Sequence, residues 1–201
     1  MIDRDAVLAC TACPRLAAFL AEARQRDPEF HNRPVPPWGL PDAAIVVVGL
    51  APGYRGANRT GKPFCGDVSG AWVYETLFRY GLATSAEPGA TVLDACITNA
   101  VKCCPPANRP LPIEIRTCRE RWLVHELDEA RVVVAFGGIA HASVLKAAGG
   151  KGTFAHLAEH SLSGGRTLLD SFHPSPLNTY TGRMSRAAFE AVFARARELT
   201  S

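Results

Sequence analysis

Four of the seven cysteines are spaced as the ligands of a metal centre would be. Cys10 and Cys13 form a C-x2-C pair directly before a proline, and Cys103 and Cys118 lie far along the chain. Two thiolates at the first spacing can bind one centre. No histidine stands at zinc-finger spacing, so the set fits either an iron–sulfur cluster or a zinc ion held by four cysteines. Cys104 competes with Cys103 for the third position.

The cysteine count argues against a disulfide framework. Seven is an odd number, and the first residues carry acids at Asp3 and Asp5 where a signal peptide would carry basic residues. We therefore expect a cytosolic protein with reduced thiols. Burial as apolar thiols accounts for Cys65, Cys96 and Cys104 individually, but not for all seven.

A glycine-rich loop over residues 49–67 has the character of a ligand-binding loop. It offers backbone N–H groups, three cations and one acid, Asp67. It is not a Walker A loop, because Pro63 follows Gly61-Lys62, and it contains no Gly-x-Gly-x-x-Gly. Turn glycines alone are the simpler explanation, but loops longer than about 12–15 residues are usually functional or disordered.

The segment 172–178 holds a histidine in a stiff loop. His173 follows an apolar run and enters a loop restrained by Pro174 and Pro176. An imidazole there can donate a hydrogen bond to a leaving group that gains negative charge. A lone histidine is as often structural. Leu177 at the tip suits a wedge that fills a gap in a base stack, or else it packs on a neighbouring helix.

Alternating elements position these residues. Apolar, β-branched runs predict buried strands, and amphipathic segments between them predict helices. The strands are expected at 44–49, 95–101, 130–136 and 167–172, and the helices at 14–26, 70–81, 112–128, 138–148 and 184–199. Residues 30–42 are proline-rich and predict an irregular crossing, and residues 161–166 predict a hairpin turn.

This alternation predicts an α/β fold with a mostly parallel sheet covered on both faces. Ligands of such sheets bind at the carboxyl ends of the strands. The expected strands end at Gly49, Asn99, Gly137-Gly138 and His173, each of which carries chemistry or conformational freedom.

Composition sets wide limits. The 201 residues are 47% hydrophobic and 20% charged, which suits one globular domain over 1–201. The net charge of +3 excludes a histone-like binder but allows a local positive face. No apolar stretch reaches the roughly 20 residues that cross a bilayer, so no membrane partner is expected.

Several motifs resemble the iron–sulfur uracil-DNA glycosylases, in particular the type B branch, family five. These motifs are Gly-Leu-Ala-Pro-Gly (49–53), Ala-Asn-Arg-Thr-Gly-Lys-Pro-Phe-Cys-Gly-Asp (57–67) and His-Pro-Ser-Pro-Leu-Asn-Thr-Tyr-Thr-Gly-Arg (173–183). Val-Lys-Cys-Cys-Pro-Pro-Ala-Asn-Arg (101–109), followed by Cys118, resembles the cluster-binding segment of families four and five. The resemblance spans residues 10 to about 186.

The resemblance implies a three-layer α/β/α sandwich around a four-stranded parallel sheet, in a monomer. It implies a structural [4Fe–4S] cluster ligated by Cys10, Cys13, Cys103 and Cys118. The implied substrate is DNA that contains uracil. The implied reaction is hydrolysis of the N-glycosidic bond.

The resemblance also assigns roles in the site. Phe64 matches the residue that stacks on the extruded base, Asn99 the one that reads the polar edge of uracil, and His173 the one that contacts its O2. Asp67 matches the residue proposed as catalytic in type B enzymes. The expected substrate-binding set is Gly49, Leu50, Ala51, Gly53, Phe64, Asn99 and His173.

Two departures from the wider pattern are informative. Family four places an acid where this chain has Leu50, so hypoxanthine and other deaminated bases become expected substrates. Ser175-Pro176-Leu177 resembles the broader superfamily, whereas type B members often carry polar residues there. The expected DNA contacts are Arg59, Lys102, Arg109, Ser175, Leu177 and Arg183.

Other classes of protein remain as alternatives. A non-catalytic iron–sulfur module that senses damaged DNA would leave Asp67 and His173 dispensable. A cysteine-ligated redox or zinc protein would leave residues 173–183 unexplained. A relative that traps the abasic sugar would need a basic loop with an embedded histidine after the first motif, which is not found here.

Overall fold

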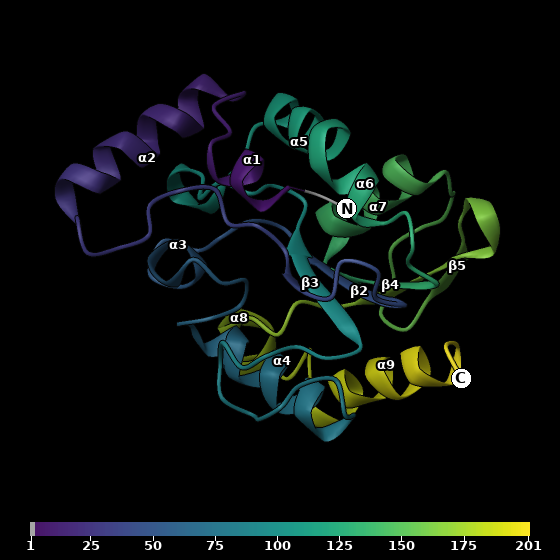
Figure 1. Cartoon of the computed structure of the whole chain (residues 1–201). Coiled ribbons are helices and arrows are strands. Elements are labelled where there is room, and N and C mark those ends of the chain that lie inside the picture. The colour runs from purple at the N-terminus through teal and green to yellow at the C-terminus, as the bar shows by residue number, and fades with distance from the viewer. Residues whose placement is uncertain (1–2) are drawn as a thin grey trace.

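A computed structural model describes residues 3–201, so that Met1 and Ile2 of the acidic N-terminus lie outside the described residues. The described residues form one mixed sheet of six strands in the order β1-β3-β2-β4-β6-β5 (Figure 1). The strands are β1 (Trp38–Gly39), β2 (Ile45–Gly49), β3 (Ala95–Asn99), β4 (Val132–Phe136), β5 (Glu159–Ser161) and β6 (Thr167–Ser171).

The four inner strands confirm the prediction of a parallel sheet. β3, β2, β4 and β6 pair in parallel. All residues of β2, β3 and β4 are buried, as are the last four of β6. Strands buried on both faces must be apolar throughout, which explains why their sequences lack the alternation of a half-exposed strand.

The predicted four-stranded parallel sheet is extended to six strands, because an antiparallel strand is added at each edge. β1 lies within the proline-rich segment 30–42 and pairs with β3. β5 pairs with β6 across the turn expected at 161–166. β1 has two residues and β5 has three, two of which are exposed, so neither has a hydrophobic period that a sequence could show.

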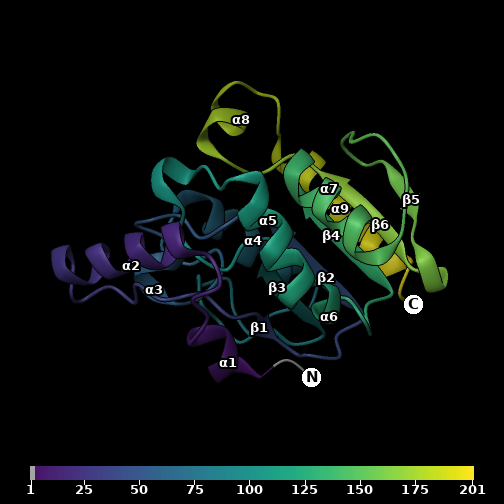
Figure 2. The same cartoon turned by 90° about the horizontal axis from the view of Figure 1, so that it is seen from above.

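Helices cover both faces of the sheet, which confirms the three-layer α/β/α arrangement. α4 (Val68–Arg79) and α9 (Arg186–Glu198) lie on one face, and α7 (Gly138–Ala148) lies on the other (Figures 1 and 2). The expected helix over 112–128 also lies on the second face, but as α5 (Pro112–Cys118), a π-helical turn η2 (Arg119–Leu123) and α6 (Val124–Glu126).

A third apolar cluster contains Cys103, Cys104 and Cys118, and Cys10 and Cys13 pack against it. α1 (Arg4–Leu8) and α2 (Pro14–Arg26) pack there, and Val7, Leu16 and Leu20 contribute its buried apolar side chains. Cys103, Cys118 and Trp122 join them from the far part of the chain.

Short helices occupy two segments expected to be loops. These are α3 (Ala57–Thr60) and α8 (Pro176–Tyr180), and α8 projects from the body of the molecule in Figure 2. The 3-10 turns are η1 (Pro106–Asn108) and η3 (Ser163–Gly165). None of the helices within residues 3–201 is long and apolar enough to cross a membrane.

Candidate active site

Residues at the carboxyl ends of β2, β3 and β6 line one cavity of about 320 Å³. Six of the seven residues predicted to bind substrate lie in its wall, and so do Asp67 and Ser175. The full lining is Leu50, Ala51, Gly53, Ala57, Phe64, Asp67, Asn99, Asn108, His173 and Ser175. Segments far apart in the sequence therefore meet where a parallel sheet binds its ligands.

Gly49 lies behind the cavity wall and makes room for two of its side chains. A Cβ atom at Gly49 would lie 2.5 Å from Asn99 Oδ1 and 2.5 Å from Phe64 Cζ. Gly49 pairs with Asn99 across β2 and β3, so the two positions are fixed relative to each other. Only glycine fits at this position without moving the pocket.

Asn99 ends β3 and its side chain is buried at the cavity. Its backbone oxygen accepts a hydrogen bond from Lys102 Nζ at 2.6 Å, which fixes the end of the strand. Within residues 3–201 its side-chain amide has no hydrogen-bond partner. The amide is therefore free to donate and accept hydrogen bonds to a ligand, as the edge of a base requires.

The backbone of Phe64 adopts a left-handed conformation that is uncommon for residues other than glycine. Its φ is 51°, a left-handed value that typically costs about 1–3 kcal/mol where it is strained. The ring packs edge-to-face on Phe136 at 5.5 Å and lies 6.0 Å from the ring of His173. Gly70 permits this turn, because a Cβ there would lie 2.1 Å from the Phe64 carbonyl oxygen.

His173 follows β6 and is held by its backbone. Its carbonyl oxygen accepts a hydrogen bond from Asn178 Nδ2 at 2.8 Å. Burial lowers the pKa of His173, and the negative charge of Asp67 partly opposes this effect. The imidazole is therefore neutral at pH 7 and can donate one hydrogen bond. Nδ1 is buried without a partner among the described residues.

Asp67 begins α4 and faces the same cavity. Its Oδ1 accepts a hydrogen bond from the backbone N–H of Gly70 at 2.9 Å, which is the usual N-cap contact. Its Oδ2 lies beside Gly56, where a Cβ would approach to 2.5 Å. One oxygen therefore caps the helix and the other points to the glycine-rich loop.

The four predicted cysteine ligands line one cavity of their own. Cys10 and Cys13 come from the N-terminal segment, and Cys103 and Cys118 from beyond β3. Cys104 does not line this cavity, although it is buried nearby, so Cys103 is the better third ligand. The backbone N–H of Lys102 donates to Cys118 Sγ at 3.2 Å.

The sulfur spacing fits a cluster better than a single zinc ion. Among the described residues no three of these Sγ atoms lie within 4.8 Å of one another. Sulfurs about 2.3 Å from a tetrahedral zinc would lie only about 3.8 Å apart. Burial raises the pKa of Cys118 to about 12, and burial and the neighbouring thiols raise that of Cys103. Without a positively charged group, four thiolates would not persist there.

The structure contradicts the prediction that Lys102 binds a phosphate. The side chain is 1% exposed. Its Nζ binds Glu126 Oε2 at 2.6 Å and Thr98 Oγ1 at 2.7 Å, in addition to the Asn99 carbonyl. The partner Glu126 lies far along the chain, so nothing local in the sequence indicates that the cation is buried.

The other predicted DNA contacts lie at the surface. Arg59, Arg109 and Arg183 are exposed. Leu177 on α8 is 73% exposed, which contradicts the alternative that it packs on a neighbouring helix. Ser175 caps α8 by accepting from the backbone N–H of Asn178.

Two residues that line the cavity were not predicted from the sequence, namely Ala57 and Asn108, and Asn108 has a left-handed φ of 54°. Tyr180 on α8 is 83% exposed and was not predicted as a DNA contact. Asn108 stands in the motif 101–109, beside cysteines and cations whose residue types carry a stronger chemical signal in the sequence.

Comparisons with known proteins point in one direction. The profile of the Uracil DNA glycosylase superfamily matches residues 36–197. The type-5 uracil-DNA glycosylase of Thermus thermophilus is 43% identical, and the match covers 98% of this chain and 99% of the relative. The type-5 enzyme of Pyrobaculum aerophilum is 39% identical, over 93% of this chain and 87% of the relative. A type-4 enzyme of Thermotoga maritima is 30% identical, over 88% and 81%.

Proposed function

The chain belongs to the uracil-DNA glycosylase superfamily, and we propose that it hydrolyses the N-glycosidic bond of uracil in DNA as a step of base-excision repair. The observation that carries the proposal is the single cavity that joins Phe64, Asn99, His173 and Asp67. Its volume of about 320 Å³ suits a single base with part of its sugar.

Binding of the base uses the walls of this cavity. A nucleotide extruded from the duplex places its base against Phe64, and stacking on an aromatic ring contributes about 1–3 kcal/mol per base. Because the Asn99 amide has both a donor and an acceptor, it pairs with the N3–H and O4 edge of uracil. Cytosine presents the reverse pattern of donor and acceptor on that edge.

Cleavage of the bond leaves negative charge on the departing base. His173, neutral at pH 7, donates a hydrogen bond to O2 as this charge develops. One preorganised donor of this kind typically contributes about 3 kcal/mol to the stability of the transition state. The histidine need not transfer a proton, since it acts on an anion that leaves.

Asp67 acts on the sugar. The sugar becomes positively charged as the bond breaks, and a carboxylate in the cavity wall stabilises that charge. The same carboxylate accepts a hydrogen bond from the attacking water and positions it. Leu50, which also lines the cavity, supplies no acid for this task.

Duplex DNA contacts the face around α8. Leu177 enters the base stack in place of the extruded nucleotide, and Ser175 donates to a phosphate at the start of the helix. Arg59, Arg109 and Arg183 contact neighbouring phosphates.

The cysteine site holds a [4Fe–4S] cluster in this proposal. Cys10, Cys13, Cys103 and Cys118 ligate it, in keeping with the spread of their sulfurs. When bound, the cluster supplies a covalent link between two distant parts of the chain, and no step of the excision passes through it.

The test is a base-excision assay on anaerobically purified protein. A labelled duplex with one U·G pair is incubated with the enzyme and cleaved with alkali at any abasic site. We expect cleavage by the native protein, and losses of at least about 100-fold for Asn99→Ala and His173→Ala. Asp67→Asn is assayed in the same way, and its matched control is Asp128→Asn, at an exposed carboxylate that does not line the cavity.

Iron-replete protein that binds the duplex but releases no base would contradict the proposal and favour the non-catalytic damage-sensing module. A parallel duplex with hypoxanthine tests the wider substrate range that Leu50 favours. If the protein excised uracil but not hypoxanthine, its substrate range would be restricted to uracil.

A further inference from the structure

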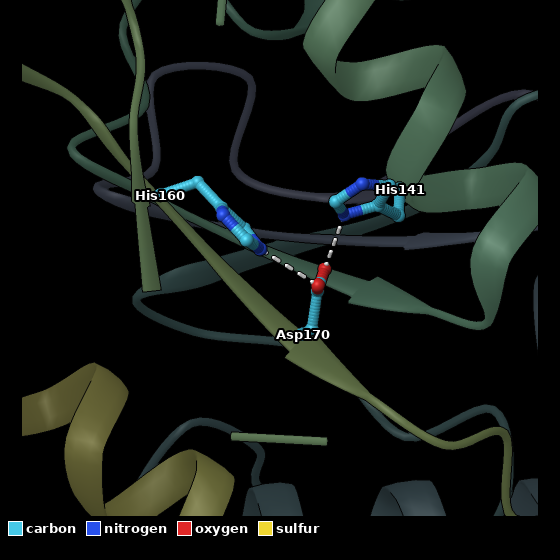
Figure 3. Close-up of side chains that lie close together, drawn as sticks. All are labelled: His141, His160 and Asp170. Carbon is cyan, nitrogen blue, oxygen red and sulfur yellow. Dashed lines mark hydrogen bonds and ion pairs between the residues drawn. The ribbon is translucent and has the colours of Figure 1, made fainter. Parts of the chain in front are cut away.

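Two histidines and an aspartate converge away from the proposed active site. His141 lies on α7, His160 on β5 and Asp170 on β6 (Figure 3). Their nitrogen and carboxylate ligand atoms all lie within 4.8 Å of one another. We propose that these three side chains bind a divalent transition-metal ion of the zinc type, in a site separate from the cysteines.

The carboxylate of Asp170 is fully buried and has no cationic side chain from lysine or arginine among its ion-pair partners in residues 3–201. Its Oδ1 lies 2.8 Å from His141 Nδ1, and its Oδ2 lies 2.9 Å from His160 Nε2. A buried carboxylate needs a compensating positive charge, because an isolated anion is strongly destabilised by the loss of water.

Both ring nitrogens of His141 face an oxygen atom. Nδ1 lies 2.8 Å from Asp170 Oδ1, and Nε2 lies 3.4 Å from the carbonyl oxygen of Gly152. A neutral imidazole has only one N–H, so it can donate to only one of these two oxygens. A metal ion bound at Nδ1 would leave the N–H on Nε2 for the Gly152 carbonyl, and both nitrogens would then have a partner.

The ligand set identifies the class of cation. The two imidazole nitrogens and both carboxylate oxygens provide four donor atoms, which completes a zinc coordination shell. Mg²⁺ and Ca²⁺ prefer oxygen ligands alone, and iron–sulfur clusters need thiolates. The contact of His141 with the Gly152 carbonyl is the outer hydrogen bond that metal-binding histidines usually make.

The site would link three elements that otherwise meet only through packing and strand pairing. It joins α7 to the edge strand β5 and to β6, and β6 leads directly to His173. His160 is the most accessible ligand, with 10% of its side chain exposed.

The test measures zinc in cluster-replete protein and identifies its ligands. Full-length protein, purified without oxygen, is dialysed against one equivalent of Zn²⁺ and then against metal-free buffer. We expect about one retained zinc per chain by mass spectrometry. Zinc-edge X-ray absorption should show nitrogen and oxygen neighbours at about 2.0–2.2 Å and no sulfur at about 2.3 Å.

The variant His160→Gln separates a metal site from a hydrogen-bonded network. The glutamine Nε2 still donates to Asp170 and preserves the fold, but an amide nitrogen is not a zinc ligand. We expect the affinity for zinc to fall by more than about 100-fold, because loss of an outer hydrogen-bond partner alone lowers metal affinity by roughly 10–100-fold. The variant should therefore retain little zinc after dialysis. His125→Ala, at an exposed His–Asp pair, should retain zinc.

Three results would overturn the proposal. These are the absence of retained zinc in the native protein, a sulfur shell that places the zinc at the cysteines, and undiminished zinc in folded His160→Gln. Each result would instead indicate that His141, His160 and Asp170 form a hydrogen-bonded network in which a protonated histidine balances the charge of Asp170. None depends on whether the protein excises uracil.

Discussion

Asp67 has a structural role as a helix cap and a proposed catalytic role, and comparing Asp67→Asn with Asp67→Ala separates the two. One carboxylate oxygen caps α4, and the side chain also lines the proposed active site. Asp67→Asn retains an oxygen for the cap but removes the charge. We expect unchanged stability and a fall in the single-turnover rate of about 100-fold or more. Asp67→Ala should show the same fall and an additional loss of about 1 kcal/mol in unfolding free energy, measured in urea. Equal rates for Asp67→Asn and the native enzyme would exclude a role for the charge.

His173 predicts a pH dependence whose sign follows from its environment. Because burial lowers its pKa below the usual 6.5, the folded protein binds a proton less readily than the unfolded chain. Its contribution to stability is therefore fully present above about pH 6.5 and is lost as the pH falls through the folded pKa.

The measurement compares unfolding free energies of native protein and His173→Gln at pH 8 and pH 5.5. Burial also lowers the pKa values of His31 and His156, but both are present in each protein and cancel in the difference. We expect the native protein to lose more stability on acidification than the variant, by up to about 1.4 kcal/mol per unit of pKa shift. A larger loss in the variant would mean that His173 is charged in the folded state.

At the scale of elements, Lys102 fixes the end of β3 rather than contacting DNA. Its ammonium group joins Glu126 of α6 to the backbone of Asn99, whose side chain lines the active site. Lys102→Met leaves Glu126 buried and unpaired, and we expect a loss of about 3–5 kcal/mol in unfolding free energy. The double variant Lys102→Met/Glu126→Leu should recover most of it. An unchanged unfolding free energy for Lys102→Met would contradict this role.

DNA binding provides an independent check on Lys102. Replacing a phosphate contact lowers the slope of log affinity against log salt by about 1. We expect that change for Arg183→Ala and not for the double variant at Lys102 and Glu126.

α8 predicts a difference between double- and single-stranded substrates. Leu177 is exposed on a short helix that begins with a proline and a serine cap. Filling a base stack matters only where a stack exists, and extrusion costs a few kcal/mol in a duplex. Leu177→Ala should reduce excision from a duplex about 10-fold or more and leave single-stranded uracil nearly unaffected. Leu40→Ala, an exposed leucine beside the opposite end of β3, is the control.

The elements that the sequence predicts well are those whose burial is uniform. Ile45–Gly49 and Val132–Phe136 are apolar throughout, because both faces of their strands are covered. β1 could not be predicted, since its place depends on Gly39, where a Cβ would lie 2.2 Å from the Ala95 carbonyl oxygen. The π-helical turn η2 covers only five residues between two α-helices, which is too short to be recognised from the apolar pattern of the sequence.

The residues of the site likewise fall into those that the sequence predicts and those that it does not. Asn99 and His173 were predictable because they end strands whose carboxyl ends meet at one edge. The burial of Lys102 and the meeting of His141 with Asp170 depend on contacts between distant elements. Local patterns carry no information about either.

At the scale of the whole molecule, the cysteine site joins the N-terminal helices to the segment that follows β3. Arg15 also joins these segments, because its guanidinium binds both carboxylate oxygens of Glu114, at 2.8 and 2.7 Å, and the carbonyl oxygen of Arg109 at 3.1 Å. Arg15 is 37% exposed, so we expect the four-cysteine site to contribute more than this pair. Loss of the proposed cluster should release α1 and α2 while the sheet remains folded. We expect Cys118→Ser to lose its iron and to be cleaved by trypsin at the arginines of α2 under native conditions. Cys104→Ala, next to a ligand but outside the cavity, should retain iron and resist cleavage. If Cys104→Ala lost its iron and Cys103→Ala retained it, Cys104 would be the third ligand in place of Cys103. If iron-free Cys118→Ser resisted trypsin, packing alone would hold α1 and α2 in place.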